Sequence, residues 1–362
     1  VTKPFLPPID EYYKKLRDIW NNKWLTNNGS KHKLFEKKLR NHTGINNISL
    51  FANGTLALDL AIKVLDLEGE IITTPFTFAA TSHMIVSNGL TPVFCDIEKE
   101  IFNLDPNKIE SLITDKTSAI MPVHIFGNPA NVEKIRKIAA KYDLKVIYDA
   151  AQAFGVEVNG KNIAEFGDVS MFSFHATKVF HSIEGGMLVY KDSGLKEKVE
   201  QMKNFGFNEA KEPQYVGTNA KMNEFQAAMG LLNLKYYQAE IKKRKKVAQK
   251  YRMRLANIKG IKFLKEMDKV KHNYAYFPIL VKEEFPVDRD ELVNHLNEYN
   301  IYPEKYYHLL CNEYESYENK SIRQGDLSNA EYIADRVLAL PIYGDLTEEQ
   351  IDYICDCINE LT

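Results

Sequence analysis

Short apolar runs alternate with segments of helical periodicity through the first half of the chain, and this alternation constrains the fold most strongly. The runs typical of strands are 70–78, 91–96, 118–127, 145–149 and 169–174. Helical segments lie between them, among them 81–86 and 132–142. Strands that alternate with helices at this spacing pair mainly in parallel. The pattern predicts an α/β domain whose active site lies where the strands end.

One lysine, Lys178, stands alone between the apolar runs 169–174 and 187–190. Both runs predict buried strands, and the glycine pair 185–186 allows the backbone to pack closely beside the lysine. An amine held in a pocket can lose its proton and attack a carbonyl group. An exposed turn lysine is the simpler interpretation of this residue on its own, because charged side chains are mostly solvated.

Two other motifs argue against the interpretation of Lys178 as an exposed turn lysine. Asp149 ends the apolar run 145–149, and the triplet Asn53, Gly54, Thr55 opens an apolar helix. The free N–H groups and the dipole at a helix start attract anions. An N-cap at Asn53 or Thr55 predicts the same local geometry, so this motif alone does not identify a phosphate site. A strand-end acid, a Schiff-base lysine and a phosphate-binding turn together are what pyridoxal phosphate (PLP) requires.

On these motifs the chain resembles the DegT/DnrJ-type sugar aminotransferases, which are PLP enzymes of aspartate-aminotransferase fold type I. The resemblance covers nearly the whole chain. Its most specific parts are Ser-Phe-His-Ala-Thr-Lys-Val-Phe (173–180), Glu-Gly-Gly (184–186), Asp-Ala-Ala-Gln (149–152), Asn-Gly-Thr (53–55) and Gly-Thr-Asn-Ala-Lys-Met (217–222). Family members that act as dehydratases carry histidine in place of this lysine, so Lys178 favours a transaminase.

The resemblance also implies a domain organisation. Residues 1–250 would form a large PLP-binding domain with an N-terminal substrate loop and a mainly parallel, seven-stranded sheet. Residues 251–362 would form a small α+β C-terminal domain. Within it we expect a strand over 271–281, a helix over 291–299 and a helix over 328–340 with Ser328 as its N-cap. No internal repeat is evident.

The resemblance implies cofactor roles for residues on these motifs. Asp149 would keep the ring nitrogen protonated, so that the ring stabilises a carbanion. Phe78 would stack on the ring, although a core phenylalanine is the default alternative. For His175, a structural hydrogen bond and direct contact with the cofactor or substrate both stay open. The implied catalytic residues are Lys178 and Asp149, and the implied cofactor-binding residues are Gly54, Thr55, Phe78, Asp149, Gln152 (to the phenolic oxygen), Ser173 (to the phosphate), His175, Lys178 and Asn219.

In the family, the residue matching Asn219 reaches the cofactor phosphate of a neighbouring subunit, which implies a homodimer with shared active sites. Lys221 stands where most family members have arginine. The compact ammonium group of lysine there replaces the planar guanidinium group, which can bind a carboxylate or phosphate through two hydrogen bonds. The loop that holds Trp24 would lie near the sugar, but a surface turn fits it equally well. The implied substrate-binding residues are Trp24, Asn27, His181, Lys221, Tyr307 and His308.

The expected reaction is a two-stage transamination. Lys178 would hold PLP, glutamate would leave its amine as pyridoxamine phosphate, and the amine would pass to a nucleotide-linked keto-sugar. The motifs are most similar to the branch that converts dTDP-4-keto-6-deoxyglucose to dTDP-4-amino-4,6-dideoxyglucose for surface polysaccharide such as O-antigen. The alternatives are a C3-keto sugar, a UDP-linked 4-keto sugar, or a PLP-fold sensor without turnover.

Composition excludes several other classes of function. With 362 residues, 27% charged residues and a net charge of −2, the chain gives no support to nucleic-acid or membrane-surface binding. No apolar run reaches the ~18 residues of a membrane span, and no signal-peptide core is present at the N-terminus. Four scattered cysteines, including the pair at 355 and 357, predict neither a disulfide framework nor a metal site, so we expect a cytoplasmic protein. The basic run 242–246 predicts a solvated helix face.

Overall fold

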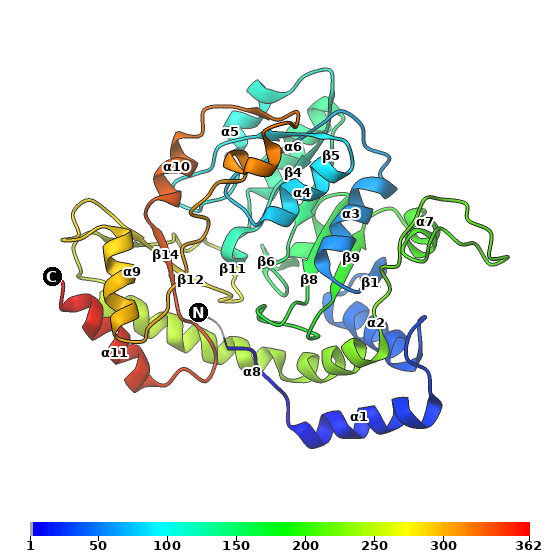
Figure 1. Ribbon diagram of the computed structural model, residues 1–362, viewed down its shortest axis with the longest axis horizontal. Helices are drawn as coiled ribbons and strands as arrows, with labels where there is room; N and C mark the ends of the chain where they lie inside the picture. Colours follow the sequence, from blue (N-terminus) through cyan, green and yellow to red (C-terminus); the bar gives the residue numbers. More distant parts are fainter. Residues whose placement is uncertain (1–2) are drawn as a thin grey trace.

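An eight-stranded sheet lies at the centre of the computed structural model, which describes residues 3–362 (Figure 1). Its strands, in spatial order, are β1 (Ile48–Phe51), β9 (Gly186–Tyr190), β8 (Val169–Ser173), β5 (Lys145–Asp149), β4 (Thr117–Met121), β2 (Glu70–Thr73), β3 (Thr91–Phe94) and β13 (Arg323–Gln324). Only β9 runs antiparallel to its neighbours. The predicted mainly parallel sheet is therefore confirmed. It has one strand more than the seven expected, because β13 from the C-terminal part pairs with β3.

Helices cover both faces of this sheet, because alternate strand residues point to opposite sides. In β5, Val146 and Tyr148 belong to one buried core, whereas Ile147 belongs to another. The first core includes residues of α2 (Ser30–Thr43) and α6 (Val132–Tyr142), and the second includes residues of α3 (Gly54–Val64), α4 (Ala79–Ser87) and α7 (Leu195–Met202). The short helix α5 (Pro106–Ile109) follows β3. The two covered faces explain why these strands are apolar throughout.

One long helix, α8 (Glu224–Leu255), joins the sheet domain to the C-terminal part. Its residue Tyr237 packs in the core of the large sheet, whereas Tyr251 and Leu255 pack in a separate core. The domain boundary expected at residue 250 lies inside this helix. The first helix, α1 (Ile9–Asn22), packs on α8. No helix among residues 3–362 has the length and hydropathy required to cross a membrane.

The second core is built on a three-stranded antiparallel sheet. Its strands are β10 (Ile261–Phe263), β12 (Phe277–Val281) and β14 (Val337–Leu340), and α9 (Arg289–Glu298) and α11 (Glu348–Asn359) pack in the same core. Cys355 and Cys357 are both buried there as free thiols. A further small sheet holds β6 (Glu157–Val158), β7 (Lys161–Asn162) and β11 (Val270–Lys271).

Three sequence-based expectations need correction here. The run 271–281 is not one strand: β11 ends at Lys271, β12 begins at Phe277, and a loop fixed by buried polar residues lies between them. The basic run 242–246 is not wholly solvated, because Arg244 is 2% exposed and pairs with Glu240. The helix expected over 328–340 is too long, because it ends at Ala334.

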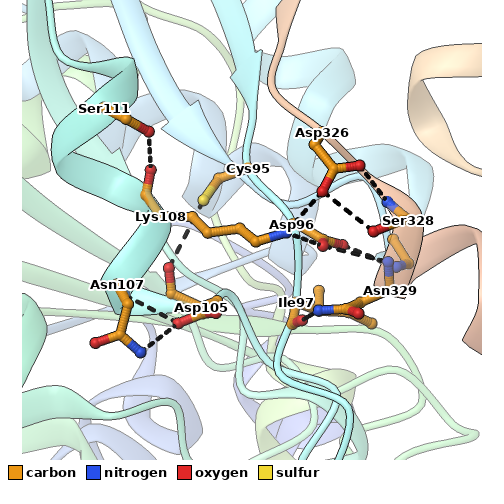
Figure 2. A network of polar contacts seen from close by, with 11 residues as sticks. Cys95, Asp96, Ile97, Asp105, Asn107, Lys108, Ser111, Asp326, Ser328 and Asn329 are labelled. Carbon is orange, nitrogen blue, oxygen red and sulfur yellow. Dashed lines mark hydrogen bonds and ion pairs between the residues drawn. The ribbon is translucent and has the colours of Figure 1, made fainter.

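The helix α10 spans Ser328–Ala334, and residues 337–340 form β14 instead. Ser328 lies inside the helix and Leu327 occupies the N-cap position, so Ser328 is not the cap. The buried Asp96, just after β3, accepts hydrogen bonds from the backbone N–H groups of Asn329 (3.2 Å) and Ala330 (2.8 Å). Lys108 donates to the same carboxylate at 2.6 Å (Figure 2). The carboxylate of Asp96, which is distant in the sequence, thus accepts the N–H groups at the start of α10 that a local N-cap would otherwise accept.

Candidate active site

A cavity of about 410 Å³ lies at the carboxyl ends of the parallel strands, as expected for this class of sheet. It is lined by every predicted cofactor residue except Asn219: Gly54, Thr55, Phe78, Asp149, Gln152, Ser173, His175 and Lys178. Tyr307, one of the predicted substrate residues, lines it too. Residues that are 124 positions apart in the sequence, such as Gly54 and Lys178, therefore share one site.

Asp149 ends β5 and is buried, with 4% of its surface exposed. Its Oδ2 accepts a hydrogen bond from the Thr81 hydroxyl at 2.7 Å, and its Oδ1 accepts one from the backbone N–H of Ala151 at 3.1 Å. Burial raises the pKa of the Asp149 carboxyl, and these hydrogen bonds with the charge of Lys178 oppose that shift. A cation placed beside this carboxylate would favour its ionised form strongly.

Lys178 is half-buried in the connection between β8 and β9. Its Nζ donates to the phenolic oxygen of Tyr276 at 3.3 Å, and its backbone N–H donates to the carbonyl of His175 at 2.9 Å. The glycine pair has the predicted effect at Gly186, where an added Cβ would lie 2.5 Å from the carbonyl oxygen of Asn53. This close approach brings the lysine connection against the start of α3.

The start of α3 is capped by Asn53, whose Oδ1 accepts a hydrogen bond from the N–H of Leu56 at 2.8 Å. Gly54 and Thr55 follow this cap and line the cavity. Ser173 lies beside them, because an added Cβ on Gly54 would be 3.1 Å from the Cβ of Ser173. The helix start is therefore both capped and open to the cavity, where its dipole and the Ser173 hydroxyl suit a phosphate group.

Phe78 and His175 line the cavity from different segments, Phe78 at the N-cap of α4 and His175 in the connection that follows β8. Phe78 is 64% exposed, so it is not the core phenylalanine that was the default alternative. The Nδ1 of His175 lies 2.8 Å from the Thr177 hydroxyl, and its Nε2 lies 3.5 Å from a carboxylate oxygen of Glu184. The exposed aromatic face of Phe78, at the rim of the cavity, suits stacking on a flat ring.

The amide of Gln152 has partners at both ends. Its Nε2 donates to the phenolic oxygen of Tyr307 at 2.7 Å, and its Oε1 accepts from the backbone N–H of Phe126 at 2.5 Å. Burial is the main cause that raises the pKa of Tyr307 well above its ordinary value, and the neighbouring Tyr276 is the second cause. The Gln152 side chain is thus fixed by protein groups, with one amide hydrogen left for the cavity.

Six predicted site residues do not line this cavity: Trp24, Asn27, His181, Asn219, Lys221 and His308. His181 is 2% exposed, and its Nε2 lies 2.7 Å from the carbonyl oxygen of Phe5, so it fastens the N-terminal segment. Burial lowers the pKa of the His181 imidazole. Lys221 donates to the Asn204 side chain at 2.5 Å, and Asn219 is exposed beside it.

Sequence reasoning missed three residues of the site: Thr81, which is buried and hydrogen-bonded to Asp149, and Tyr276 and Tyr306, which line the cavity. Thr81 lies one helical turn after Phe78, and this spacing could have identified it. Tyr276 and Tyr306 come from loops in the C-terminal part, where no local motif marks them. With Tyr307 they form the tyrosine wall of the cavity (Tyr276, Tyr306, Tyr307). The opposite, strand-end wall consists of Gly54, Thr55, Asp149, Ser173 and Lys178.

The strand-end wall has the donor set that PLP needs. A buried carboxylate with a raised pKa matches a cationic ring nitrogen, and a helix start with a hydroxyl matches a phosphate group. Lys178 brings to the same cavity the amine that a covalent link to PLP would need. Among residues 3–362 no group of three or more His, Cys, Asp or Glu side chains is arranged to hold a metal ion.

Comparison with known proteins agrees with this chemistry. The chain is 45% identical over 361 residues to a protein of Shigella dysenteriae named dTDP-4-amino-4,6-dideoxy-D-glucose transaminase, covering 100% of this chain and 98% of the relative. A crystal structure of DesI in the presence of its TDP-sugar product matches with a TM-score of 0.93 and 32% identity, covering 99% of this chain and 91% of the other.

A structure of NtdA from Bacillus subtilis with bound pyridoxamine phosphate matches with a TM-score of 0.89 and 27% identity, covering 98% of this chain and 81% of the other. Residues 9–359 match the model of the DegT/DnrJ/EryC1/StrS aminotransferase family. The fold is that of the type I PLP enzymes, and the cofactor is pyridoxal phosphate. The chain therefore belongs to the DegT/DnrJ/EryC1/StrS aminotransferase family and is a sugar aminotransferase.

Proposed function

We propose that this aminotransferase moves the amino group of glutamate onto C4 of dTDP-4-keto-6-deoxyglucose, which gives dTDP-4-amino-4,6-dideoxyglucose for surface polysaccharide such as O-antigen. The single observation that carries the chemistry is that Lys178 and Asp149 face one cavity at the strand ends. The name and the 45% identity of the Shigella dysenteriae relative support the sugar. The four cysteines of the sequence are free and buried, which supports a reducing, cytoplasmic setting.

Residues of the strand-end wall would hold the cofactor. The N–H groups at Gly54 and Thr55 and the hydroxyl of Ser173 would bind its phosphate, and the exposed Phe78 would pack against its ring. Asp149 would hold a proton on the ring nitrogen, and Thr81 keeps the carboxylate oriented through its 2.7 Å hydrogen bond. PLP, when bound, supplies the electron sink that makes the carbon bearing the amine acidic.

Lys178 has two tasks in this proposal. Its Nζ would form the covalent link to the cofactor, and as a free amine it would take the proton from the carbon that bears the donor amine. The same atom returns a proton when the amine is delivered to the sugar. Glutamate and the sugar must use one cavity in turn, which suits its mixed lining of phenols, hydroxyls and the His175–Glu184 pair.

We also propose a homodimer in which Asn219 reaches the active site of the partner. Asn219 lies at the base of the loop that follows α7 and projects away from the chain in Figure 1. That loop exposes apolar side chains, with Val216 89% and Phe205 48% exposed, and on α1 Trp20 is 66% exposed. Exposed apolar groups of this size favour an interface between subunits.

Purified protein with PLP and glutamate, followed by dTDP-4-keto-6-deoxyglucose, tests the reaction by mass spectrometry of the product. An amine-bearing dTDP-sugar is expected, and NMR of the product fixes the carbon and its configuration. Glutamate turnover without amination of this sugar would contradict the substrate and point to a C3-keto or UDP-linked sugar. Mixed dimers of Lys178→Ala and Asn219→Ala chains test the sharing of sites: restored activity is expected, and none at all would contradict it.

A further inference from the structure

We propose that Tyr276 is a positioning residue of this active site, whose phenolic oxygen holds Nζ of Lys178 over the cavity. The inference deepens the proposed function and rests on the role given there to Lys178. The structure shows the contact directly: Nζ donates to the phenolic oxygen at 3.3 Å, and both residues line the cavity. Tyr276 is therefore the point at which the tyrosine wall touches the reactive group of the strand-end wall.

The ring of Tyr276 is held firmly enough to define a position. It is 6% exposed and packs against Phe126, with ring centroids 5.5 Å apart, and edge-on against Tyr306 at 5.4 Å. A buried aromatic ring with neighbours on two sides has few alternative rotamers. The hydroxyl it carries is consequently fixed relative to the cavity.

The backbone that carries Tyr276 is also fixed, by two buried polar residues. Arg244 of α8 donates to the carbonyl of Ala275 at 3.4 Å, and its own charge is paired with Glu240 at 3.1 Å. Asn273 is 1% exposed, and its amide donates to the carbonyl oxygens of Gln152 at 2.8 Å and Phe154 at 3.2 Å. The loop 272–276 is thereby fastened to the chain that follows Asp149.

A hydroxyl is the suitable group for this position because the amine of Lys178 changes its protonation state during the reaction. An ammonium group only donates hydrogen bonds, whereas a neutral amine also accepts one. The phenol of Tyr276 can accept from the first and donate to the second. A carboxylate would serve only the charged form, and a phenylalanine would serve neither.

The other two tyrosines have different positions. The Tyr307 hydroxyl accepts from Gln152 at 2.7 Å, and burial together with the neighbouring Tyr276 raises the pKa of Tyr306. Neither contacts Nζ of Lys178. The three phenols are thus not interchangeable, and removing the Tyr276 hydroxyl should affect Lys178 in a way that removing a neighbouring hydroxyl does not.

Tyr276→Phe tests the proposal, because it keeps the ring packing and deletes the hydroxyl. We expect kcat of the glutamate half-reaction to fall about 10²-fold, the cost of a misplaced reacting group, with KM for both substrates within about twofold. A second measurement needs no turnover: the rate at which the cofactor-free protein captures PLP, followed by absorbance, is expected to fall about tenfold, because the attacking amine is no longer held.

Tyr274→Phe is the matched control, since Tyr274 lies on the same loop but, unlike Tyr276, is not among the residues that line the active-site cavity. It should match the wild type in kcat and in capture rate. Unchanged kcat and capture rate in Tyr276→Phe would overturn the proposal, and so would equal losses in both variants or an effect confined to KM. A wild type without the glutamate half-reaction would count against the proposed function, whereas the capture rates would still decide the role of Tyr276.

Discussion

The two walls of the cavity differ in how the chain builds them. Each residue of the strand-end wall lies within a few positions of a strand of the large sheet, so the sheet itself brings these residues to one edge. The tyrosine wall comes from two loops, 272–276 and 302–310, which enter from the C-terminal part. Its position depends on buried contacts of residues that do not themselves line the cavity, such as Arg244 and Asn273.

The two walls also differ in charge. The strand-end wall holds a carboxylate and an amine, the groups that hold and move protons. Burial raises the pKa of both Tyr306 and Tyr307, so these phenols stay neutral near pH 7. The contrast supports a division of work under the proposed function, in which one wall carries the chemistry and the other positions the reacting groups. The variants below test that division.

The largest expected effect comes from Lys178→Ala. Without the amine, turnover should fall more than about 10⁴-fold, because both the covalent link and the mobile proton are lost. The variant should still bind pyridoxamine phosphate, which is measurable by equilibrium dialysis. Lys191→Ala, at an exposed lysine just after β9, is the control and should be as active as the wild type. Full activity in Lys178→Ala would refute the mechanism.

Asp149→Asn should cost about 10³-fold in kcat, because a charge that stabilises the protonated ring nitrogen is lost. Asp143→Asn is its control, at an exposed position before the same strand. Steady-state rates with product detection by mass spectrometry decide the outcome. A loss of less than about threefold would show that the buried carboxylate is structural and that the strand-end wall does not carry the chemistry.

The two walls were not equally predictable from the sequence. Asp149, Ser173 and Lys178 sit at the ends of strands whose apolar runs are visible locally, so both the strands and the shared site were predicted. Tyr276 was not, because its loop interrupts what looked like one continuous strand. Likewise the helix expected to reach residue 340 ends at Ala334, because pairing with β12 makes the apolar run after it a strand. Contacts between residues far apart in the sequence decided these cases, by strand pairing at residues 337–340 and by the buried hydrogen bonds of Asn273 in the loop 272–276.

Tyr307→Phe should have a moderate effect. The change leaves a buried amide N–H of Gln152 without its acceptor, which costs about 1–3 kcal/mol. We expect roughly a tenfold loss in kcat/KM if the amide shifts within the cavity. Tyr302→Phe, on the same loop but 58% exposed, is the control. Wild-type kinetics in Tyr307→Phe would show that the tyrosine wall does not position Gln152.

Asp96→Asn should affect stability rather than chemistry. Asp96 accepts from Lys108 and from two backbone N–H groups of α10, so it anchors the C-terminal segment beside β3 (Figure 2). Loss of the charge should cost about 2 kcal/mol of unfolding free energy and lower Tm by several degrees. Asp326→Asn is the control, because Asp326 also contacts Lys108 but is 70% exposed. An equal Tm in both variants would show that the anchor contributes nothing.

The smallest expected effect is a pH dependence that belongs to the strand-end wall alone. Burial raises the pKa of Asp149 in the folded, cofactor-free protein above its unfolded value. Stability from this group is therefore full below the unfolded pKa, about 3.9, and is lost as pH rises through the folded pKa. Asp149→Asn does not titrate, so the Tm of the cofactor-free variant minus that of the wild type should grow from pH 4 to pH 8. Tyr307→Phe should show no such trend, because its phenol is neutral throughout this range. A Tm difference for Asp149→Asn that stays flat with pH would place the carboxylate in a solvated environment and remove the contrast in charge between the two walls.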